Sequence, residues 1–119
     1  MTTQPVSAWG TWQQTRNTLV QTLSLNIELR NAKTPGTPDE QALSQNIDQN
    51  IKDMQAHALN GLRQIDQAVL ESNPAAQLAR ASKAAKTEAD RIRKATKRVG
   101  DLTALTGKLT GVVTGIRGL

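Results

Sequence analysis

The sequence contains no cysteine and almost no aromatic residues. The absence of cysteine excludes disulfides, thiolate nucleophiles and cysteine-type zinc sites. Trp9 and Trp12 are the only aromatic residues, since Phe and Tyr do not occur. Aromatic side chains normally supply much of the area buried in a compact core, so this core has to be built from Leu, Ile, Val and Ala. Such a thin core is typical of long helices packed side by side, often completed by another copy of the chain.

Targeting and membrane-spanning signals are also missing from the sequence. Residues 1–10 lack the basic region and apolar run of a cleavable signal peptide. No stretch reaches the roughly 18 uncharged apolar residues of a membrane-spanning helix. We therefore expect synthesis in the cytoplasm, with signal-less export or incorporation into a particle as open alternatives.

Three breaks divide the chain into helical segments: Thr34-Pro35-Gly36-Thr37-Pro38, Ser72-Asn73-Pro74 and Gly100-Asp101. Proline removes a helical hydrogen bond and glycine weakens a helix, so no helix is expected to continue through these points. Between them, apolar residues recur every three or four positions. The sequence predicts a single all-α unit over residues 1–119. We expect a long helical hairpin or bundle with three long helices and a shorter C-terminal helix rich in Gly and Thr, at residues 7–33, 38–72, 74–99 and 101–117.

The starts of two helices have clear sequence signals. Thr37 stands at a capping position, Pro38 at the first helical position and Glu40 three residues after Thr37, which is the spacing of a capping box. Further along, Gly100 is placed as the glycine that ends one helix, and Asp101 as the cap of the next.

Apolar stripes predict which helical faces are buried. In the third segment, Leu78, Ala85, Ile92 and Val99 recur every seven residues, with alanines between them, which is typical of tightly packed coiled coils. The expected stripes of the first two segments are Trp9, Trp12, Leu19, Leu23 and Ile27, and Leu43, Ile47, Ile51, Met54, Ala58, Leu62, Ile65 and Val69.

Residues able to carry catalysis or hold a metal are few. His57 is the only histidine, and a metal site needs three or four converging ligands. The candidate carboxylates are scattered on polar faces, so we interpret them, like His57, as surface groups: Asp48, Asp53, Asp66 and Glu71. No phosphate-binding glycine motif or nucleophile elbow occurs. We therefore expect no catalytic residues, no cofactor and no metal.

The C-terminal segment carries the most distinctive motif. Gly107, Gly111 and Gly115 lie four residues apart, a glycine-zipper spacing that lets another helix approach closely. The apolar face of the same segment includes Leu105, Leu109, Val112 and Ile116. We expect these residues to form a docking element against protein. A membrane-contacting helix and a flexible glycine-rich tail are the alternatives.

Charge is distributed unevenly along the chain, whose formal net charge is +5. Residues 1–77 carry five Lys/Arg and seven Asp/Glu, whereas residues 78–119 carry ten and three. The basic half could bind nucleic acid, an anionic membrane or the acidic half of a neighbouring copy. Its candidate patch is Arg80, Lys83, Lys86, Arg91, Arg93, Lys94, Lys97 and Arg98, for which a partly paired, solvated helix surface is the alternative.

Trp9 and Trp12 are three residues apart and so share one helical face, where they could anchor a core or an interface. An N-terminal tryptophan, a proline-broken turn and two long helices resemble, in architecture, small secreted helical hairpins such as needle subunits of injection machines or WXG-type proteins. The likeness covers about the first 72 residues. It lacks the W-x-G turn between two helices, because Trp9-Gly10 lies at the start of a helix.

These observations favour a non-enzymatic structural or adaptor protein that acts through protein–protein assembly. We expect a homo-oligomer or a component of a larger bacterial or phage complex. The alternatives are a sequence-indifferent nucleic-acid-binding protein using helix 78–99 and a membrane-active protein using residues 101–119.

Overall fold

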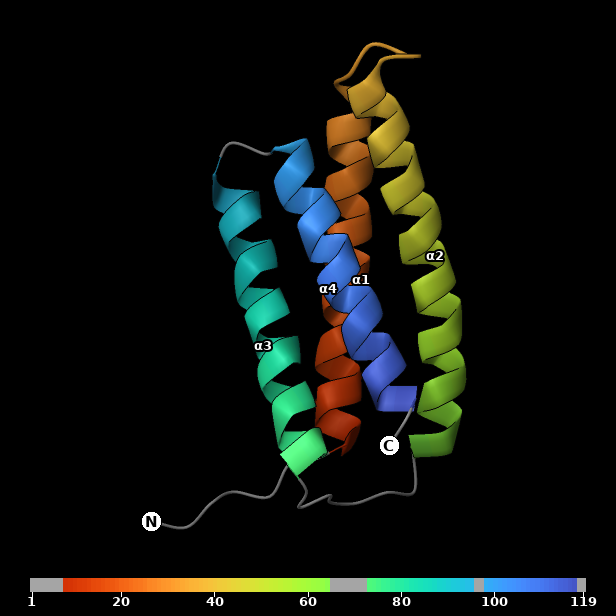
Figure 1. Cartoon of the computed structure of the whole chain (residues 1–119), viewed down its shortest axis with the longest axis vertical. Coiled ribbons are helices and arrows are strands. Elements are labelled where there is room, and N and C mark those ends of the chain that lie inside the picture. Colours follow the sequence, from red (N-terminus) through yellow and green to blue (C-terminus); the bar gives the residue numbers. More distant parts are fainter. Residues whose placement is uncertain (1–7, 65–72, 96–97, 118–119) are drawn as a thin grey trace.

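The computed structural model is an all-α bundle of four helices (Figure 1). It describes residues 8–64, 73–95 and 98–117, with the backbone alone at residues 8–9, 60–64 and 73–76. The helices are α1 (Ala8–Asn31), α2 (Pro38–Gln64), α3 (Asn73–Lys94) and α4 (Val99–Arg117). The predicted class, with three long helices and a shorter last one, is confirmed. The predicted continuation of the second helix through residues 65–72 lies outside the described residues.

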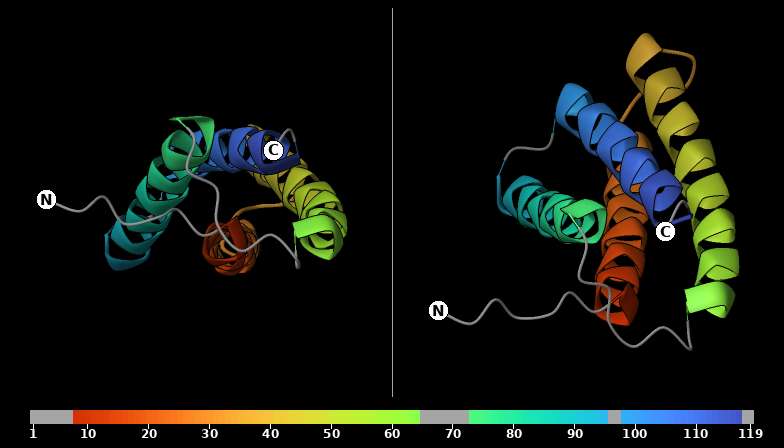
Figure 2. Two further views of the ribbon diagram at one scale, coloured as in Figure 1. Left: turned by 90° about the horizontal axis from the view of Figure 1, so that it is seen from below. Right: turned by 60° about the horizontal axis from the view of Figure 1, so that its bottom comes forward.

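The four helices form a flattened bundle with dimensions of 50 × 30 × 17 Å. Helices α1 and α4 contact each other, and each also contacts both α2 and α3. Over the residues that the structure describes, α2 and α3 do not contact one another. Seen from below in Figure 2, they lie on opposite sides of the α1–α4 pair. Helices α2 and α3 are therefore two opposite edges of the molecule.

The turn between α1 and α2 forms at the first predicted break. The Thr37 amide donates to the Thr34 carbonyl at 3.3 Å, and Gly36 has a φ of 83°. Proline followed by glycine with positive φ is the central pair of a type II turn. The Thr37 hydroxyl then accepts from the Glu40 amide at 3.3 Å, as a capping residue should. The Glu40 side chain accepts from Ser44 (3.2 Å) and the Thr37 amide is already bonded to Thr34, so these contacts show only one half of the predicted capping box.

The corner between α3 and α4 lies earlier than the predicted break at Gly100-Asp101. Helix α3 ends at Lys94 and α4 begins at Val99, so Gly100 and Asp101 are both in the first turn of α4. In that turn the Asp101 carboxylate complements the exposed amides of the helix. It also lies 3.6 Å from the Arg91 guanidinium at the end of α3. The predictions that Gly100 ends a helix and Asp101 caps the next one are therefore wrong.

The apolar core lies where α4 meets α1 and α3. The predicted face of α4 is buried, and so are Ala85, Ala89 and Ile92 from the heptad pattern of α3. Alanine at two of these positions lets α3 approach its neighbours closely. The core is completed by Leu19 and Leu25 of α1 and Leu43 of α2, together with the buried residues of α4: Leu102, Leu105, Leu109, Val112, Val113 and Ile116.

The apolar stripes predicted for α1 and α2 are only partly buried. Leu19, Leu43 and Ile47 are buried as expected. Ile51 is 43% exposed, and Ala58 is exposed as well. The positions buried in their place are polar: Thr11, Thr15, Thr18, Thr22 and Asn26 of α1, and Asn46, Asn50, Asp53 and His57 of α2.

Threonine is tolerated inside α1 because its hydroxyl can be satisfied within its own helix. The hydroxyls of Thr15, Thr18 and Thr22 donate to the carbonyls four residues earlier, at 2.7 to 2.9 Å. This back-bonding satisfies a polar atom that would otherwise be costly to bury. The methyl group of each threonine is then free to pack, so the stripe behaves as a small apolar surface.

Amide, hydroxyl and carboxylate groups connect α1, α2 and α4 across the interior. Asn26 donates to the Asn50 side chain at 2.8 Å, and Asn46 donates to Thr103 of α4 at 3.0 Å. The Thr110 hydroxyl of α4 donates to Asp53 at 2.6 Å. Buried polar pairs of this kind are satisfied in only one alignment of the helices, so they fix its register.

Candidate interaction surface

Asp53 and His57, interpreted as surface groups from the sequence, are buried. Asp53 is 5% exposed and His57 is 1% exposed. The Asp53 carboxylate accepts from Gln49 at 2.9 Å and from Thr110 at 2.6 Å. These donors hold the carboxylate between α2 and α4, where it serves as a structural acceptor. The prediction of exposure was wrong because both residues follow Asn46 and Asn50 at helical spacing, on the buried face of α2.

His57 and Trp12 clamp α1 to α2. The rings are stacked with centroids 4.8 Å apart, the indole N–H donates to the His57 carbonyl at 2.6 Å, and Nε2 of His57 lies 2.7 Å from the Trp12 carbonyl. Burial lowers the pKa of His57, opposed by the hydrogen bond to Trp12 and reinforced by the charge of Arg16. His57 is therefore held neutral, with Nε2 donating to the carbonyl.

The described residues contain no cluster of three His, Cys, Asp or Glu side chains suited to a metal ion. Asp48 is exposed on α2, and Asp66 and Glu71 lie outside the described residues. The buried polar side chains therefore serve to form hydrogen bonds between the helices.

Tryptophan and the C-terminal apolar face were predicted as interaction residues, but they lie mostly inside the bundle. Leu105, Leu109 and Ile116 are at most 1% exposed and belong to the core. Trp12 is half-buried against His57, and the side chain of Trp9 is not described. Val112 lines the surface groove described below, at its floor. This bundle already covers Leu105, Leu109 and Ile116, while the prediction that the C-terminal segment docks a partner stays a prediction.

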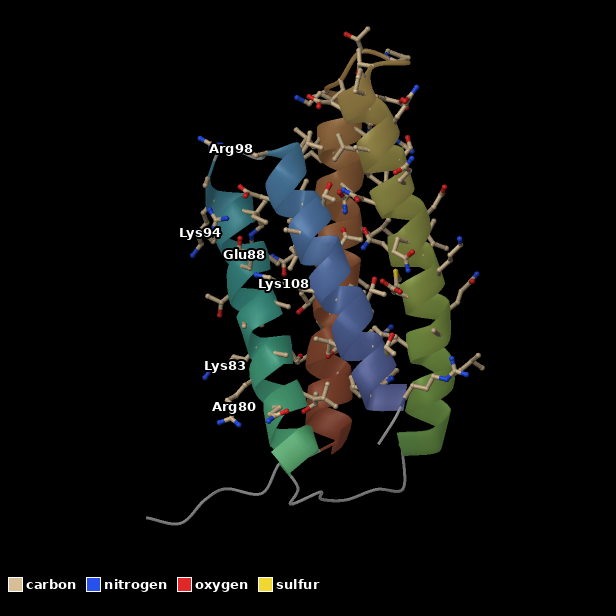
Figure 3. The ribbon with its side chains drawn as sticks, in the orientation of Figure 1. Arg80, Lys83, Glu88, Lys94, Arg98 and Lys108 are labelled. Carbon is tan, nitrogen blue, oxygen red and sulfur yellow. The ribbon has the colours of Figure 1, made fainter. Side chains whose placement is uncertain are left out.

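The basic patch predicted from the sequence lies along the outer side of α3. Figure 3 shows Arg80, Lys83 and Lys94 pointing away from the bundle. Helix α3 holds six Lys/Arg and two Asp/Glu, a formal charge of +4. The structure describes every member of the patch except Lys97. Five members of this patch are exposed and form no ion pair with a described carboxylate: Arg80, Lys83, Arg93, Lys94 and Arg98. The same holds for Lys108 of α4 and, away from the patch, for Arg16, Lys52 and Arg117.

Two ion pairs neutralise part of the same helix. Arg91 binds Glu88 at 2.6 Å, and Lys86 binds Asp90 at 3.2 Å. The hydrogen bond from Arg91 lowers the pKa of Glu88, and hydrogen bonds from Gln21 and Lys86 lower that of Asp90. Both pairs are solvent-exposed, where ion pairs contribute little to stability. The part of the patch left unpaired is thus concentrated at the two ends of α3 and at Lys108.

A groove runs between α3 and α4 beside these cations. Its volume is about 370 Å³, and its lining is mostly apolar. Two exposed alanines from α3 and an exposed glycine from α4 keep it open, because none of them fills the space between the helices. Lys108 projects at its edge, between the two helices in Figure 3. The lining residues are Leu78, Ala81, Ala84, Lys108, Gly111 and Val112.

The three glycines of the ladder have different surroundings. A Cβ at Gly115 would collide with the Leu78 side chain, so this glycine permits the contact between α3 and α4. A Cβ at Gly107 or Gly111 would meet nothing within 4 Å. Gly115 is therefore the member used in packing within the described bundle, while Gly107 and Gly111 face open space. Of the two alanines that line the groove, Ala81 was assigned from the sequence to the alanine seam of the third segment, and Ala84 was not singled out; both are exposed.

Neither a protein-family model, nor a curated protein, nor a solved structure matches this chain. None of the helices, over their described residues, is long and apolar enough to cross a membrane.

Proposed function

We propose that this chain is a structural or adaptor protein that binds a protein partner through the face formed by α3 and α4. The observation that carries the proposal is the apolar groove between α3 and α4, with the exposed cation Lys108 in its lining. Exposed apolar surface with a charged rim is the usual composition of a protein-binding site.

The glycine and alanine content of the groove supports the same proposal. Glycine inside a helix costs roughly 1 kcal/mol relative to alanine. At Gly111 a methyl group would meet nothing within 4 Å in the isolated bundle, so internal packing does not require the glycine. A partner helix lying in the groove would occupy the space that a larger side chain at Gly111 would fill, because small residues let two helix backbones come close. The bundle itself buries the apolar face of α4, so a partner would meet the groove and not the leucines of that face.

Site-specific photo-crosslinking in the cells that produce the chain tests the proposal. A crosslinking amino acid at Ala84 should yield protein adducts, and the same amino acid at exposed Ser24 of α1 should yield none. Reversing the charge in the groove lining with Lys108→Glu should weaken the adducts from position 84, since the partner is held partly by charge. Equal adducts from positions 84 and 24, or none from either, would contradict the proposal.

A second candidate function is binding to nucleic acid, which the row of unpaired cations favours. Arg80 and Lys94 are 14 residues apart, or about 21 Å along the helix, long enough to meet several phosphates. Such binding would weaken steeply as salt increases. A mobility-shift assay at low salt measures it, with Lys83→Glu/Lys94→Glu as the variant expected to lose the shift. An unshifted wild-type chain would exclude this candidate.

A further inference from the structure

The outer face of α2 exposes two large apolar side chains. Ile51 is 43% exposed and Leu59 is 63% exposed, eight residues apart on the same helix. Gln55 and Ala58 between them are exposed as well. Apolar surface of this kind gains free energy when another surface covers it. The outer face of α2 is thus an apolar ridge bordered by polar residues.

The ridge and the groove lie on opposite edges of one molecule. The ridge is on α2 and the groove between α3 and α4, and α2 and α3 do not contact one another over their described residues. In Figure 1 these helices form the right and left margins of the bundle. Both surfaces are therefore available at once.

The two surfaces are complementary in shape and in charge. The groove is open because Ala81, Ala84 and Gly111 are small, whereas the ridge offers large side chains. Without the buried Asp53, helix α2 contains three Asp/Glu and two Lys/Arg, a formal charge of −1, against +4 for α3. On the outer face of α2, Asp48 is exposed one turn before the exposed Lys52. Opposite net charges favour the encounter of two such edges and disfavour contact between two copies of the same edge.

We infer that the occupant of the groove is a second copy of this chain, which inserts Ile51 and Leu59 of its α2 between α3 and α4. The inference rests on the proposed function and names its partner. The contact joins two different surfaces of the same molecule, so it is heterologous. After pairing, one copy keeps its free ridge and the other keeps its free groove. Association therefore continues into rows or rings and does not stop at a symmetric dimer.

Two variants of the whole chain, each blocked on one surface, test this contact. Ala84→Gln/Gly111→Gln fills the groove, and Ile51→Gln/Leu59→Gln removes the ridge. All four positions are exposed, so the bundle should keep its helical circular dichroism. Matched controls are Gly107→Gln, an open glycine outside the groove lining, and Val20→Gln, a 44% exposed apolar residue on α1. Light scattering measures the mass of each protein and of their mixture.

The wild-type chain and both controls should grow beyond 12.9 kDa as concentration rises. Each blocked variant alone should stay at that mass over the same range, with association weakened roughly tenfold or more by the loss of its apolar anchors. An equimolar mixture of the two blocked variants should form pairs of twice the mass, because the intact ridge of one fits the intact groove of the other. A symmetric interface would not produce this rescue.

Charge changes on the ridge provide an independent test of the same contact. Asp48→Lys should weaken association and Lys52→Glu should strengthen it, because the docked ridge faces a basic edge. Equal or opposite responses would contradict the docking. A wild-type chain that stays at 12.9 kDa at every concentration would overturn the inference. The proposed function would then still stand if position 84 crosslinks to a different protein in cells, and fall if it crosslinks to none.

Discussion

Helix α4 packs against α2 and α3 in two different ways. Towards α2 it presents threonines, which bind Asn46 and Asp53 at 3.0 and 2.6 Å. Towards α3 and α1 it presents leucine, valine and isoleucine, which share one apolar core with alanines of α3 and leucines of α1. The hydrogen bonds of the polar side are satisfied in one register of the helices only. The apolar side tolerates sliding of one helix along another, but it supplies most of the buried apolar area. Specificity and stability are therefore supplied by two different faces of one helix.

The apolar side also explains why an open groove exists where it does. Helix α3 carries short side chains at this contact, because alanine occupies its buried positions. The exposed Ala81 and Ala84 extend this small-residue surface outward. On the polar side, side chains of α2 and α4 bridge the two helices directly. A surface for a partner therefore arises beside the apolar contact.

The largest effect is expected from truncating the apolar side. Leu109→Ala removes a fully buried side chain and leaves a cavity, which should lower the free energy of unfolding by about 2–5 kcal/mol. Chemical denaturation monitored by circular dichroism measures the change. Thr114→Ala, at an exposed position on the same helix, is the control and should have a much smaller effect.

A smaller effect is expected from disrupting the polar side. Asn26→Leu keeps the branching of the side chain at Cγ but removes the donor to Asn50 and leaves buried amides unpaired, at a cost of about 1–3 kcal/mol. The same denaturation experiment compares it with Leu109→Ala. A gain in stability from Asn26→Leu would contradict the view that the hydrogen bonds of Asn26 with Asn46 and Asn50 stabilise the bundle.

Acidification should weaken the α1–α2 contact through His57. Burial lowers the pKa of His57 below its usual 6.5, so the folded chain holds it neutral while the unfolded chain takes up a proton. Stability from this residue is therefore fully present above that value and is lost progressively as pH falls below it. Thermal melting from about pH 7.5 to about pH 5 measures the effect, with His57→Gln as the control that should lose this part of the slope. Equal slopes in both proteins would contradict the account.

The smallest effects separate the three glycines of α4. Gly107→Ala and Gly111→Ala should each stabilise the isolated bundle by up to about 1 kcal/mol, because the added methyl group meets open space. Gly115→Ala should gain less or destabilise, since its Cβ collides with Leu78. Melting at low protein concentration distinguishes them. An equal change in melting temperature at all three positions would show that the groove and the packed contact are not distinct.

The sequence predicted the helices well because their signals are local. Proline, glycine and a capping threonine mark the turn at residues 34–37, and a spacing of three and four marks the buried face of α4. The corner before Val99 was misplaced because Gly100 is equally compatible with the first turn of a helix. Its position depends on how α4 packs back on α3.

The interior was harder to predict because burial was inferred from apolar residues alone. Thr15, Thr22 and Asn26 follow a helical spacing, and so do Asn46, Asn50, Asp53 and His57. Each set is polar, and only the partner helix shows that its groups can bond to one another. The basic patch was visible in composition, whereas the groove depends on the relative position of Ala84 and Gly111, which come from different helices.

Hydrogen–deuterium exchange of the whole chain, at low and at high concentration, most directly tests the claim that copies associate through complementary edges around a closed interior. We predict that amides gain protection at high concentration over residues 77–84 and 107–112, and over residues 48–59, while those over residues 13–27 do not change. The expected segments are the groove and the ridge. Protection gained mainly on α1, or no gain anywhere, would contradict this account.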